Sequence, residues 1–527
     1  MKKITLLYLV LSLPLLAISQ IDKQIANIDN YMTQAIVDWN IPGAAIAIVK
    51  DGEIVFEKGY GVKNVETNDP VDENTIFAIA SNTKAYTAAA LAQLVDQDKL
   101  SWDDKVVKHL PYFKLYNDYV TEEFTVKDLL CHRSGLKTFS GDLLWYGSDY
   151  SRKQVIKKAR FLEPNYGFRS GYGYQNIMFI AAGEIVSKVS GMSWDNYIKT
   201  NFLDPLGMSS TLTSIRDFKG STNKSEPHND IKGSNEKIDW VNWDNIGGAG
   251  ALISSAHDAA QWLMLQADSG NLNGQEFWSI DRTQEMWSPQ TPKKLSGWHR
   301  KNFPSKHFSA YGLGWDLFDY HGRLVVNHGG GYDGFISQSA VVPEEKLGFI
   351  IMTNNVNSLS YAMMYHILDA FLAPGDFESK DWGDMLLGYK KQGAKDDKAN
   401  LKKIKKERIK GTKPSASMED FAGYYEDKMY GGLSIKAREG ILYFSFDHSN
   451  IFRGTFEHWQ DDTFRLYWGT KMMLPPGMAN FKVDENGKVI DLIIDVPNPD
   501  FDFTEFHFFK KTAKKKASLK HVKKQAK

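Results

Sequence analysis

The sequence predicts an α+β fold, in which an antiparallel sheet carries flanking helices and a helical subdomain, followed by a small all-β barrel at the C-terminal end. Two observations predict the first part: β-rich segments lie at both ends of residues 20–375, and helical patterns fill the region between them. The third observation is a run of short alternating segments, each bounded by turn residues, over residues 415–510. We therefore expect two domains.

The first 19 residues have the pattern of a cleavable secretory signal. Lys2 and Lys3 precede an apolar stretch, and the small residues Ala17 and Ser19 follow it. The stretch is too short for a stable membrane span, and no later one reaches the roughly 18 to 20 apolar residues that a spanning helix needs. We expect cleavage after Ser19 and an exported protein, periplasmic or secreted.

Cysteine and charge content show how the fold can be stabilised and which partners the protein can have. Cys131 is the only cysteine, so no disulfide can form within the chain and the fold must depend on its core. Positive and negative residues balance at 64 each, but the last 18 residues hold nine lysines and no acidic residue. We expect residues 511–527 to be a disordered basic tail, with weak contact to an anionic envelope surface as the alternative. No feature indicates a nucleic-acid partner, and the oligomeric state stays open.

The elements of the first domain follow in order from its N-terminal end. A helical pattern covers residues 24–39, and two β-rich segments within residues 43–60 are joined by Asp-Gly, a strong hairpin signal. Residues 85–95 are rich in Ala and Leu, which predicts a helix that enters a core. After a mostly helical middle, a further helix begins at Ser255, three residues before an aspartate in a capping arrangement.

The end of this domain returns to strands. Four β-rich segments lie within residues 311–354, and residues 360–372 have a helical pattern. Residues 376–414 are dense in Lys, Asp and Glu, which predicts a charged helical linker. The predicted barrel over residues 415–510 follows it.

One of four Ser-x-x-Lys sequences has the context of an activated nucleophile. A hydroxyl is a weak nucleophile at neutral pH and needs an adjacent base, and residues i and i+3 share one face of a helix. Ser81 and Lys84 open the core-directed helix, where burial can lower the pKa of the lysine. The other three pairs lie in a Gly-containing turn or in a polar loop: Ser134 and Lys137, Ser221 and Lys224, Ser234 and Lys237. We therefore predict Ser81 as the nucleophile.

A Tyr-x-Asn motif offers partners for this pair. Tyr174-Gln175-Asn176 is the only such motif among the 24 tyrosines, and it precedes an apolar helical segment. A tyrosine near a cationic lysine gives up its proton more easily, and an asparagine amide can hold both Lys84 and a substrate carbonyl. On its own, the motif would be no more than an aromatic residue beside a helix cap.

The third motif is His328-Gly329-Gly330-Gly331, at the end of an apolar strand. Glycines let a ligand approach the backbone, and a substrate lying along this strand can pair with its main chain. The backbone N–H of Gly331, with that of Ser81, is a candidate oxyanion site. A lone histidine in a Gly-rich turn is otherwise more often structural.

Cofactor chemistry is not indicated. The 13 histidines form no His-Glu-x-x-His or Cys/His cluster, so we expect no metal, and no phosphate-binding glycine motif precedes a suitable helix. The Gly-x-Ser-x-Gly elbow of α/β-hydrolases is also absent.

The three motifs, in this order, resemble the class C β-lactamase family, which also contains DD-peptidases, D-aminopeptidases and esterases. The resemblance covers about residues 25–373 and includes flanking stretches such as TIFAIASNTKAYTAAALAQL and GYQNIMFIAAGEIVSKVSG. It implies a β-lactamase/transpeptidase-like fold and a penicillin-recognising type of site. The resemblance implies that Ser81 is the nucleophile and that Lys84 and Tyr174 handle the protons. It also implies that substrate is bound by Asn176, His328, Gly329 and Gly330.

Two departures from the family are visible. His328 stands where class C β-lactamases have the lysine of Lys-Thr-Gly, and the His-x-Gly form is more similar to the peptidase and esterase branches. Its imidazole would offer a hydrogen bond to a substrate carboxylate or to Tyr174, with a pH-dependent charge. Cys131 stands where relatives often have threonine, and there we expect only a small buried side chain. Residues 419–509 resemble the lipocalin-like module that follows this domain in some relatives.

We expect an exported serine hydrolase that forms an acyl-enzyme at Ser81 with small amides or esters, D-amino-acid peptides among them. Its expected partner is a small molecule or short peptide. The alternatives are an esterase of the same family and a non-catalytic module that binds muropeptides or lipids.

Overall fold

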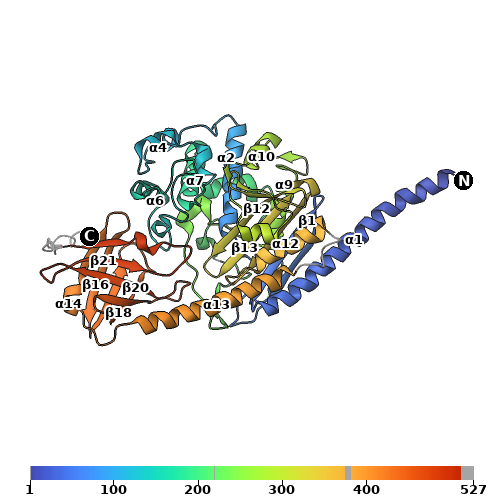
Figure 1. The fold of residues 1–527 in the computed structure, drawn as a ribbon. Helices are drawn as coiled ribbons and strands as arrows, with labels where there is room; N and C mark the ends of the chain where they lie inside the picture. The colour runs from blue at the N-terminus through green and yellow to red at the C-terminus, as the bar shows by residue number, and fades with distance from the viewer. Residues whose placement is uncertain (1, 219, 374–380, 512–527) are drawn as a thin grey trace, which may run out of the picture. The chain divides into compact units, whose positions relative to one another are not determined.

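The computed structural model describes residues 2–218, 220–373 and 381–511, with side chains from residue 20 onward. Apart from Lys511, the predicted basic tail lies outside these residues. The chain divides into two compact units, coloured along the chain in Figure 1. Unit 1 is Met1–Tyr146 with Tyr150–Leu401, and unit 2 is Gly147–Asp149 with Lys402–Lys527.

Unit 1 is built on an eight-stranded sheet in the order β2-β1-β14-β13-β12-β11-β10-β9, in which each neighbouring pair is antiparallel. The strands of this sheet are β1 (Gly43–Lys50), β2 (Glu53–Gly61), β9 (Thr291–Pro292), β10 (Ser309–Tyr311), β11 (Asp316–Tyr320), β12 (Arg323–Tyr332), β13 (Phe335–Val342) and β14 (Leu347–Thr353). The predicted hairpin is confirmed. Because β1 also pairs with β14, the two ends of the domain meet in one sheet, as expected from the order of the segments.

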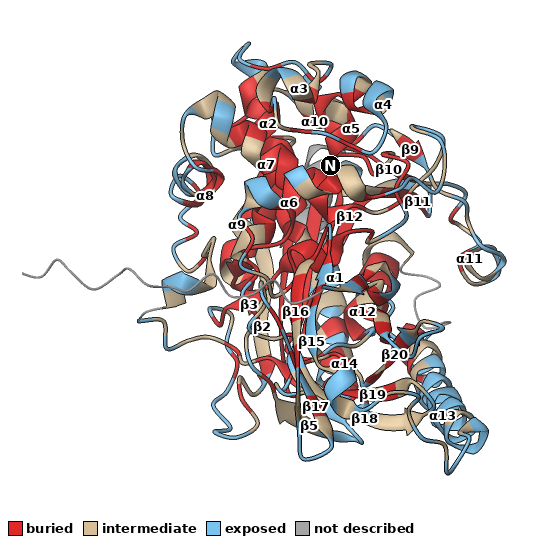
Figure 2. Cartoon of the chain, turned by 90° about the vertical axis from the view of Figure 1, so that its left-hand side faces the viewer, coloured by how far each residue is buried: buried red, intermediate tan, exposed pale blue. Residues whose placement is uncertain are grey.

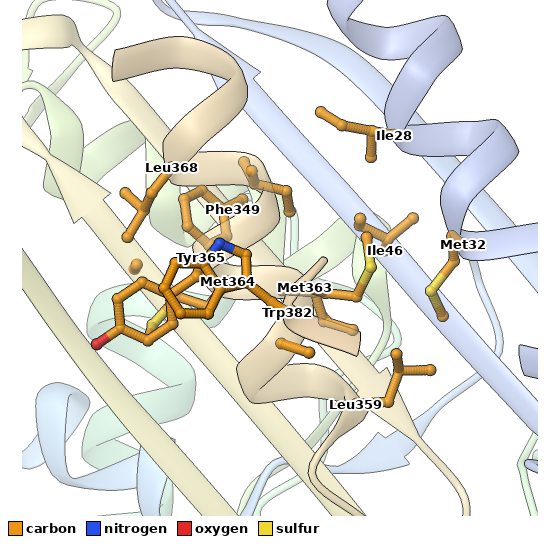
Figure 3. Close-up of a cluster of buried hydrophobic side chains, with 14 of the residues drawn as sticks. Ile28, Met32, Ile46, Phe349, Leu359, Met363, Met364, Tyr365, Leu368 and Trp382 are labelled. Atoms are coloured by element: carbon orange, nitrogen blue, oxygen red, sulfur yellow. The ribbon is translucent and has the colours of Figure 1, made fainter. Parts of the chain in front are cut away.

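Helices pack on both faces of this sheet. On one face α1 and α12 enclose a core with the sheet residues Ile46 and Phe349 (Figure 3). On the other face α9 packs against β1 and β14. The helices are α1 (Lys2–Asp38), α2 (Thr83–Asp96), α3 (Val106–His109), α4 (Asp118–Glu123), α5 (Val126–Leu129), α6 (Arg152–Lys158), α7 (Asn176–Ser190), α8 (Trp194–Ile198), α9 (Ala256–Ala267), α10 (Ile280–Met286), α11 (Gly297–Asn302) and α12 (Leu359–Leu372).

The helical subdomain places α2 at the centre of unit 1. α2 contacts α7, and the short helical segment η6 (Asp244–Ala249) contacts both. Figure 2 shows α2 and α7 largely in the colour of buried residues, and every residue of α2 from Thr83 to Leu94 is buried. Its small alanine side chains allow this close approach of neighbours on all sides. A polar group at the start of α2 is therefore held in a rigid, dry setting.

Unit 2 is a closed barrel of eight antiparallel strands, so the predicted small all-β barrel is confirmed. Its strands are β15 (Gly423–Asp427), β16 (Gly431–Arg438), β17 (Ile441–Phe446), β18 (Arg453–Gln460), β19 (Thr463–Trp468), β20 (Gly477–Val483), β21 (Val489–Asp495) and β22 (His507–Lys510), preceded by α14 (Met418–Phe421). Phenylalanines fill its interior, and Phe444 stacks on Phe456 with ring centroids 4.4 Å apart. Eight strands leave room for little more than side chains.

The segment predicted as a charged linker contains the helix α13 (Trp382–Glu407). Among the residues that the structure describes, no helix is long and apolar enough to cross a bilayer.

Candidate active site

Ser81 lies in a single 3₁₀ turn, Ala80–Asn82, directly before α2. Its side chain is partly exposed, whereas its neighbours are buried. Ala80 has a φ of 45°, a left-handed conformation that a residue with a Cβ adopts only at a cost. The turn thus presents the Ser81 hydroxyl at the edge of a buried region, where a substrate can reach it.

Lys84 is fully buried, and its amine contacts three oxygen atoms. Nζ lies 2.9 Å from Ser81 Oγ, 2.8 Å from Asn176 Oδ1 and 2.8 Å from the carbonyl oxygen of Ala249. Burial lowers the pKa of Lys84 well below its usual value, and the charge of Asp142 opposes this only in part. Sequence context had predicted this direction.

A neutral Lys84 satisfies all three contacts at once. The neutral amine has two N–H donors and one lone pair, while Asn176 Oδ1 and the Ala249 carbonyl can only accept. In that form, two donors serve these acceptors, and the lone pair faces the Ser81 hydroxyl, which can donate its hydrogen bond to it. This is the arrangement of a general base beside its nucleophile.

Asn176 is held in place by a residue that the sequence did not single out. Its Nδ2 donates to Asp142 Oδ2 at 2.6 Å, which turns Oδ1 toward Lys84. Asp142 is buried in the 3₁₀ turn Asp142–Leu144, and nothing in its sequence surroundings marks it. The amide of Asn176 thus connects a carboxylate to the amine of the base.

Tyr174 lies against both members of the pair. Its hydroxyl interacts with the Ser81 hydroxyl, and its ring centroid is 4.7 Å from Lys84 Nζ. The sequence suggested that a cationic lysine would lower the pKa of this tyrosine. Instead burial raises the pKa of Tyr174, and the negative charges of Asp142 and Asp316 raise it further. Tyr174 therefore keeps its proton and acts as a hydrogen-bond donor.

His132 is a second residue that the sequence did not single out. It is fully buried with a φ of 56°, and it bonds the residues on both sides of Tyr174. Its carbonyl accepts from the N–H of Gly173 at 2.9 Å, and its Nδ1 accepts from the N–H of Gln175 at 3.0 Å. The imidazole ring also packs on Tyr174, with centroids 4.2 Å apart. Burial lowers the pKa of His132, so the ring is neutral.

His328 lies on β12, which continues through the glycines to Tyr332 rather than turning at them. Its Nδ1 is 2.7 Å from the Gly329 carbonyl oxygen, and its Nε2 is 2.8 Å from the Tyr311 hydroxyl. The carbonyl can only accept, so Nδ1 carries the proton and Nε2 accepts from Tyr311. Burial lowers the pKa of His328 to about 3. Both nitrogens are engaged by other partners, and the suggested hydrogen bond to Tyr174 is not formed.

The glycines bring this strand against the nucleophile turn. A Cβ on Gly330 would collide with the Ile79 carbonyl oxygen and with Ser337 Oγ, so only glycine fits there. Pairing of β12 with β11 ends at Asn327, which leaves the following residues without a β11 partner. Gly331 lies beyond that point and is exposed. The backbone N–H groups of Gly331 and Ser81 remain the predicted oxyanion site.

A polar network fixes the turn to the sheet. Asn82 Nδ2 donates to Ser337 Oγ at 2.8 Å, and Ser339 Oγ donates to Asn82 Oδ1 at 2.5 Å. Ser337 Oγ in turn donates to the Ile79 carbonyl at 2.8 Å. Ile79 and Asn82, which lie on either side of Ser81 in the sequence, are thus both bonded to β13. These bonds hold Ser81 at a fixed place beside β12.

The other Ser-x-x-Lys pairs have no such setting. Lys224 and Lys237 form ion pairs with Glu226, and Lys137 is exposed.

Within the described part of the chain, no group of three or more His, Cys, Asp or Glu side chains could hold a metal ion.

Comparison with known proteins agrees with this geometry. The Beta-lactamase family profile matches residues 26–371, and a domain of unknown function, DUF3471, matches residues 407–510. The "Unguisins hydrolase ungD'" of Aspergillus campestris is 30% identical over 381 residues, which cover 68% of this chain and 67% of the relative. The chain spans about two thirds of the length of such curated relatives.

Solved structures share the fold at lower identity. The octameric penicillin-binding protein homologue from Pyrococcus abyssi has a TM-score of 0.58 at 22% identity, over 92% of this chain and 100% of that one. The D-amino acid amidase from Ochrobactrum anthropi has a TM-score of 0.53 at 20% identity, over 65% and 98%. With its buried lysine beside a reachable serine, the chain belongs to the beta-lactamase family and is a serine hydrolase.

Proposed function

We propose that this protein is an exported hydrolase that cleaves small amides or esters through an acyl-enzyme at Ser81, with short peptides containing D-amino acids as its preferred substrates. The observation that carries the proposal is the 2.9 Å contact between Lys84 Nζ and Ser81 Oγ, made by a buried lysine whose pKa is held well below its usual value. A lowered pKa favours the neutral form of the amine, which can accept the Ser81 hydroxyl proton.

The proposed reaction follows from the contacts. Lys84 takes the proton of Ser81 as Oγ attacks the substrate carbonyl, and the N–H groups of Ser81 and Gly331 stabilise the oxyanion. Tyr174, whose hydroxyl lies against Oγ, passes a proton to the leaving nitrogen or oxygen and recovers it from Lys84. Water then attacks the acyl-enzyme through the same proton transfers in reverse, which releases the acid and restores Ser81.

Two observations support a peptide or amide over a β-lactam. His328, in the place of the family's lysine, is neutral and bonded on both nitrogens, so it offers no fixed positive charge to a substrate carboxylate. A similar protein is named as an unguisins hydrolase, and a D-amino acid amidase and a D-stereospecific amidohydrolase share the fold, which supports an amide substrate. The signal-like first 19 residues support export.

An esterase is the second candidate, because the same contacts serve an alkoxide leaving group, which needs less help from Tyr174 than an amine does. One protein of similar structure, EstCE1, is a hydrolase with promiscuous acyltransferase activity. Turnover of p-nitrophenyl acyl esters compared with D-alanyl amides separates the two.

The test is covalent capture. Residues 20–527 are incubated with a fluorophosphonate probe, and intact mass and peptide mapping locate the adduct. We expect one adduct at Ser81, none in Ser81→Ala, and unchanged labelling in Ser134→Ala, which alters a decoy motif. Equal labelling of wild type and Ser81→Ala would refute the assignment. Acylation without turnover on any substrate would favour the non-catalytic binding module.

A further inference from the structure

The outer face of four neighbouring barrel strands, β16 to β19, gathers positive charge. Lys436, Arg438, Arg453 and Arg465 alternate along these strands with buried residues that point into the barrel. Glu457 is the single acidic residue of the four strands. Among the described residues, no carboxylate forms an ion pair with any of the four cations. We call this surface the basic face.

Two tyrosines lie on the basic face in one row across the strands. Tyr443 pairs with Thr455 on β18, and Thr455 pairs with Tyr467 on β19. Tyr443 is 43% exposed and Tyr467 is 40% exposed. Because they are two strands apart, about 9.5 Å separates their backbones across the sheet. Lys436 continues the row on the other side of Tyr443.

The opposite half of the barrel is different. There Lys511 pairs with Glu426 at 2.9 Å, and His507 pairs with Asp491 at 2.8 Å. Beside the basic face, Tyr424 of β15 donates to Asp447 at 2.9 Å, so its hydroxyl already has a carboxylate partner. Unpaired cations and a row of tyrosines therefore occur together on one half only, which indicates a binding surface rather than a uniformly solvated barrel.

We propose that the basic face binds a polysaccharide strand that carries carboxylates. Aromatic faces stack on the C–H faces of sugar rings, and in a β-linked strand alternate rings present the same face at a spacing that two strands of a sheet can match. The hydroxyls of Thr455, between the two tyrosines, and of Ser445, opposite Arg453, suit sugar hydroxyls. Guanidinium groups of Arg453 and Arg465 pair with carboxylates in a fork geometry.

A lipid surface fits less well. Membrane-surface elements insert aliphatic and aromatic side chains into the headgroup boundary. On the outer side of β16 to β19, Ile441 is the single aliphatic side chain, and it is partly buried. Nothing in this binding depends on Ser81, so the proposal stands apart from the catalytic one.

The test measures binding of the full-length protein to soluble poly-β-mannuronate, a uronic acid polymer, by calorimetry. We expect binding that weakens at least tenfold on the neutral propylene glycol ester of the same polymer. Tyr443→Ala and Tyr467→Ala should each weaken binding roughly tenfold, about 1.4 kcal/mol, and Arg453→Gln should do so as well. Phe509→Ala, which removes a 51% exposed ring on β22, is the matched control and should bind as wild type does.

The lysine-rich C-terminal residues are present in every variant, so their contribution cancels. Fluorophosphonate labelling of Ser81 in each variant verifies that the chain is folded. If the two tyrosine variants bind the polymer as tightly as wild type, the basic face is not the site. Tighter binding of single-stranded DNA or of phosphatidylglycerol vesicles, lost in the same variants, would also overturn the assignment to a glycan.

Discussion

Replacing His132 with alanine should slow acylation of Ser81 in protein that is still folded, in addition to weakening the fold. The change removes the Nδ1 acceptor, which leaves the N–H of buried Gln175 without its partner. An unpaired buried N–H costs about 1–3 kcal/mol, and the lost packing on Tyr174 brings the total to roughly 2–4 kcal/mol. Tyr174 gains room to move, and a shift of about 1 Å in a catalytic group can slow a reaction roughly 100-fold.

The assay separates positioning from stability. Acylation is followed as the burst of p-nitrophenol from an activated ester, and stability by urea unfolding. His132→Asn should recover most of the acylation rate, because asparagine tolerates a positive φ and its Oδ1 can accept from Gln175. His228→Ala is the matched control, since His228 is also buried and bonds backbone groups of Val65 and Asn354.

We expect His228→Ala to lose similar stability but to acylate within about twofold of wild type. The reasoning fails if His132→Ala acylates at the wild-type rate under conditions where it is folded. It also fails if His132→Asn is as slow as His132→Ala, because then the acceptor at Nδ1 does not set the position of Tyr174. A loss confined to KM would point to substrate binding instead.

Four further outcomes follow from the same geometry. Tyr174→Phe keeps the ring but removes the proton donor, and should lower amide turnover about 10²- to 10⁴-fold with unchanged unfolding. The acylation rate should fall with decreasing pH through the lowered pKa of Lys84. Folding stability should also fall as pH drops from about 10.5 toward that pKa, because Lys84 binds its proton more tightly in the unfolded chain than in the folded one. Urea unfolding midpoints of wild type and Lys84→Met, compared across pH, measure this effect. Asp142→Ala releases the amide of Asn176 and should slow acylation roughly tenfold in the burst assay. Cys131 should resist thiol reagents at pH 8 in the native state, because burial raises its pKa to about 12; reaction as fast as in urea would contradict its placement.

The parts of the fold that sequence could predict are those with local signals. The Asp-Gly turn defined the hairpin of β1 and β2, and alternating short segments defined the barrel. The nucleophile was separated from three decoys because only Ser81 precedes an Ala-rich run, and such a run packs closely on all sides. Burial of Lys84, and hence its lowered pKa, follows from that one local feature.

The missing parts of the site depend on distant contacts and on backbone geometry. Asp142 bonds Asn176 from 34 residues away, and Asn82 bonds Ser337 from 255 residues away. His132 acts through a positive φ, which no pattern of residue types reveals. Tyr311 could not be linked to His328 without knowing that β10 and β12 lie on either side of β11.

A histidine at position 328 keeps a second permanent positive charge away from buried Lys84, whose charge itself lowers the pKa of His328. A lysine there would place a second amine in the same buried region, and each positive charge would make the other more costly. His328 avoids this by accepting a hydrogen bond from Tyr311 and donating one to the Gly329 carbonyl, so it satisfies its partners without a charge. His132, on the other side of Tyr174, is also neutral and accepts from the N–H of Gln175 through Nδ1. With both imidazoles neutral, the phenol of Tyr174 and the amine of Lys84 are left to move the protons, and substrate selection at this strand must depend on shape and backbone pairing rather than on a salt bridge.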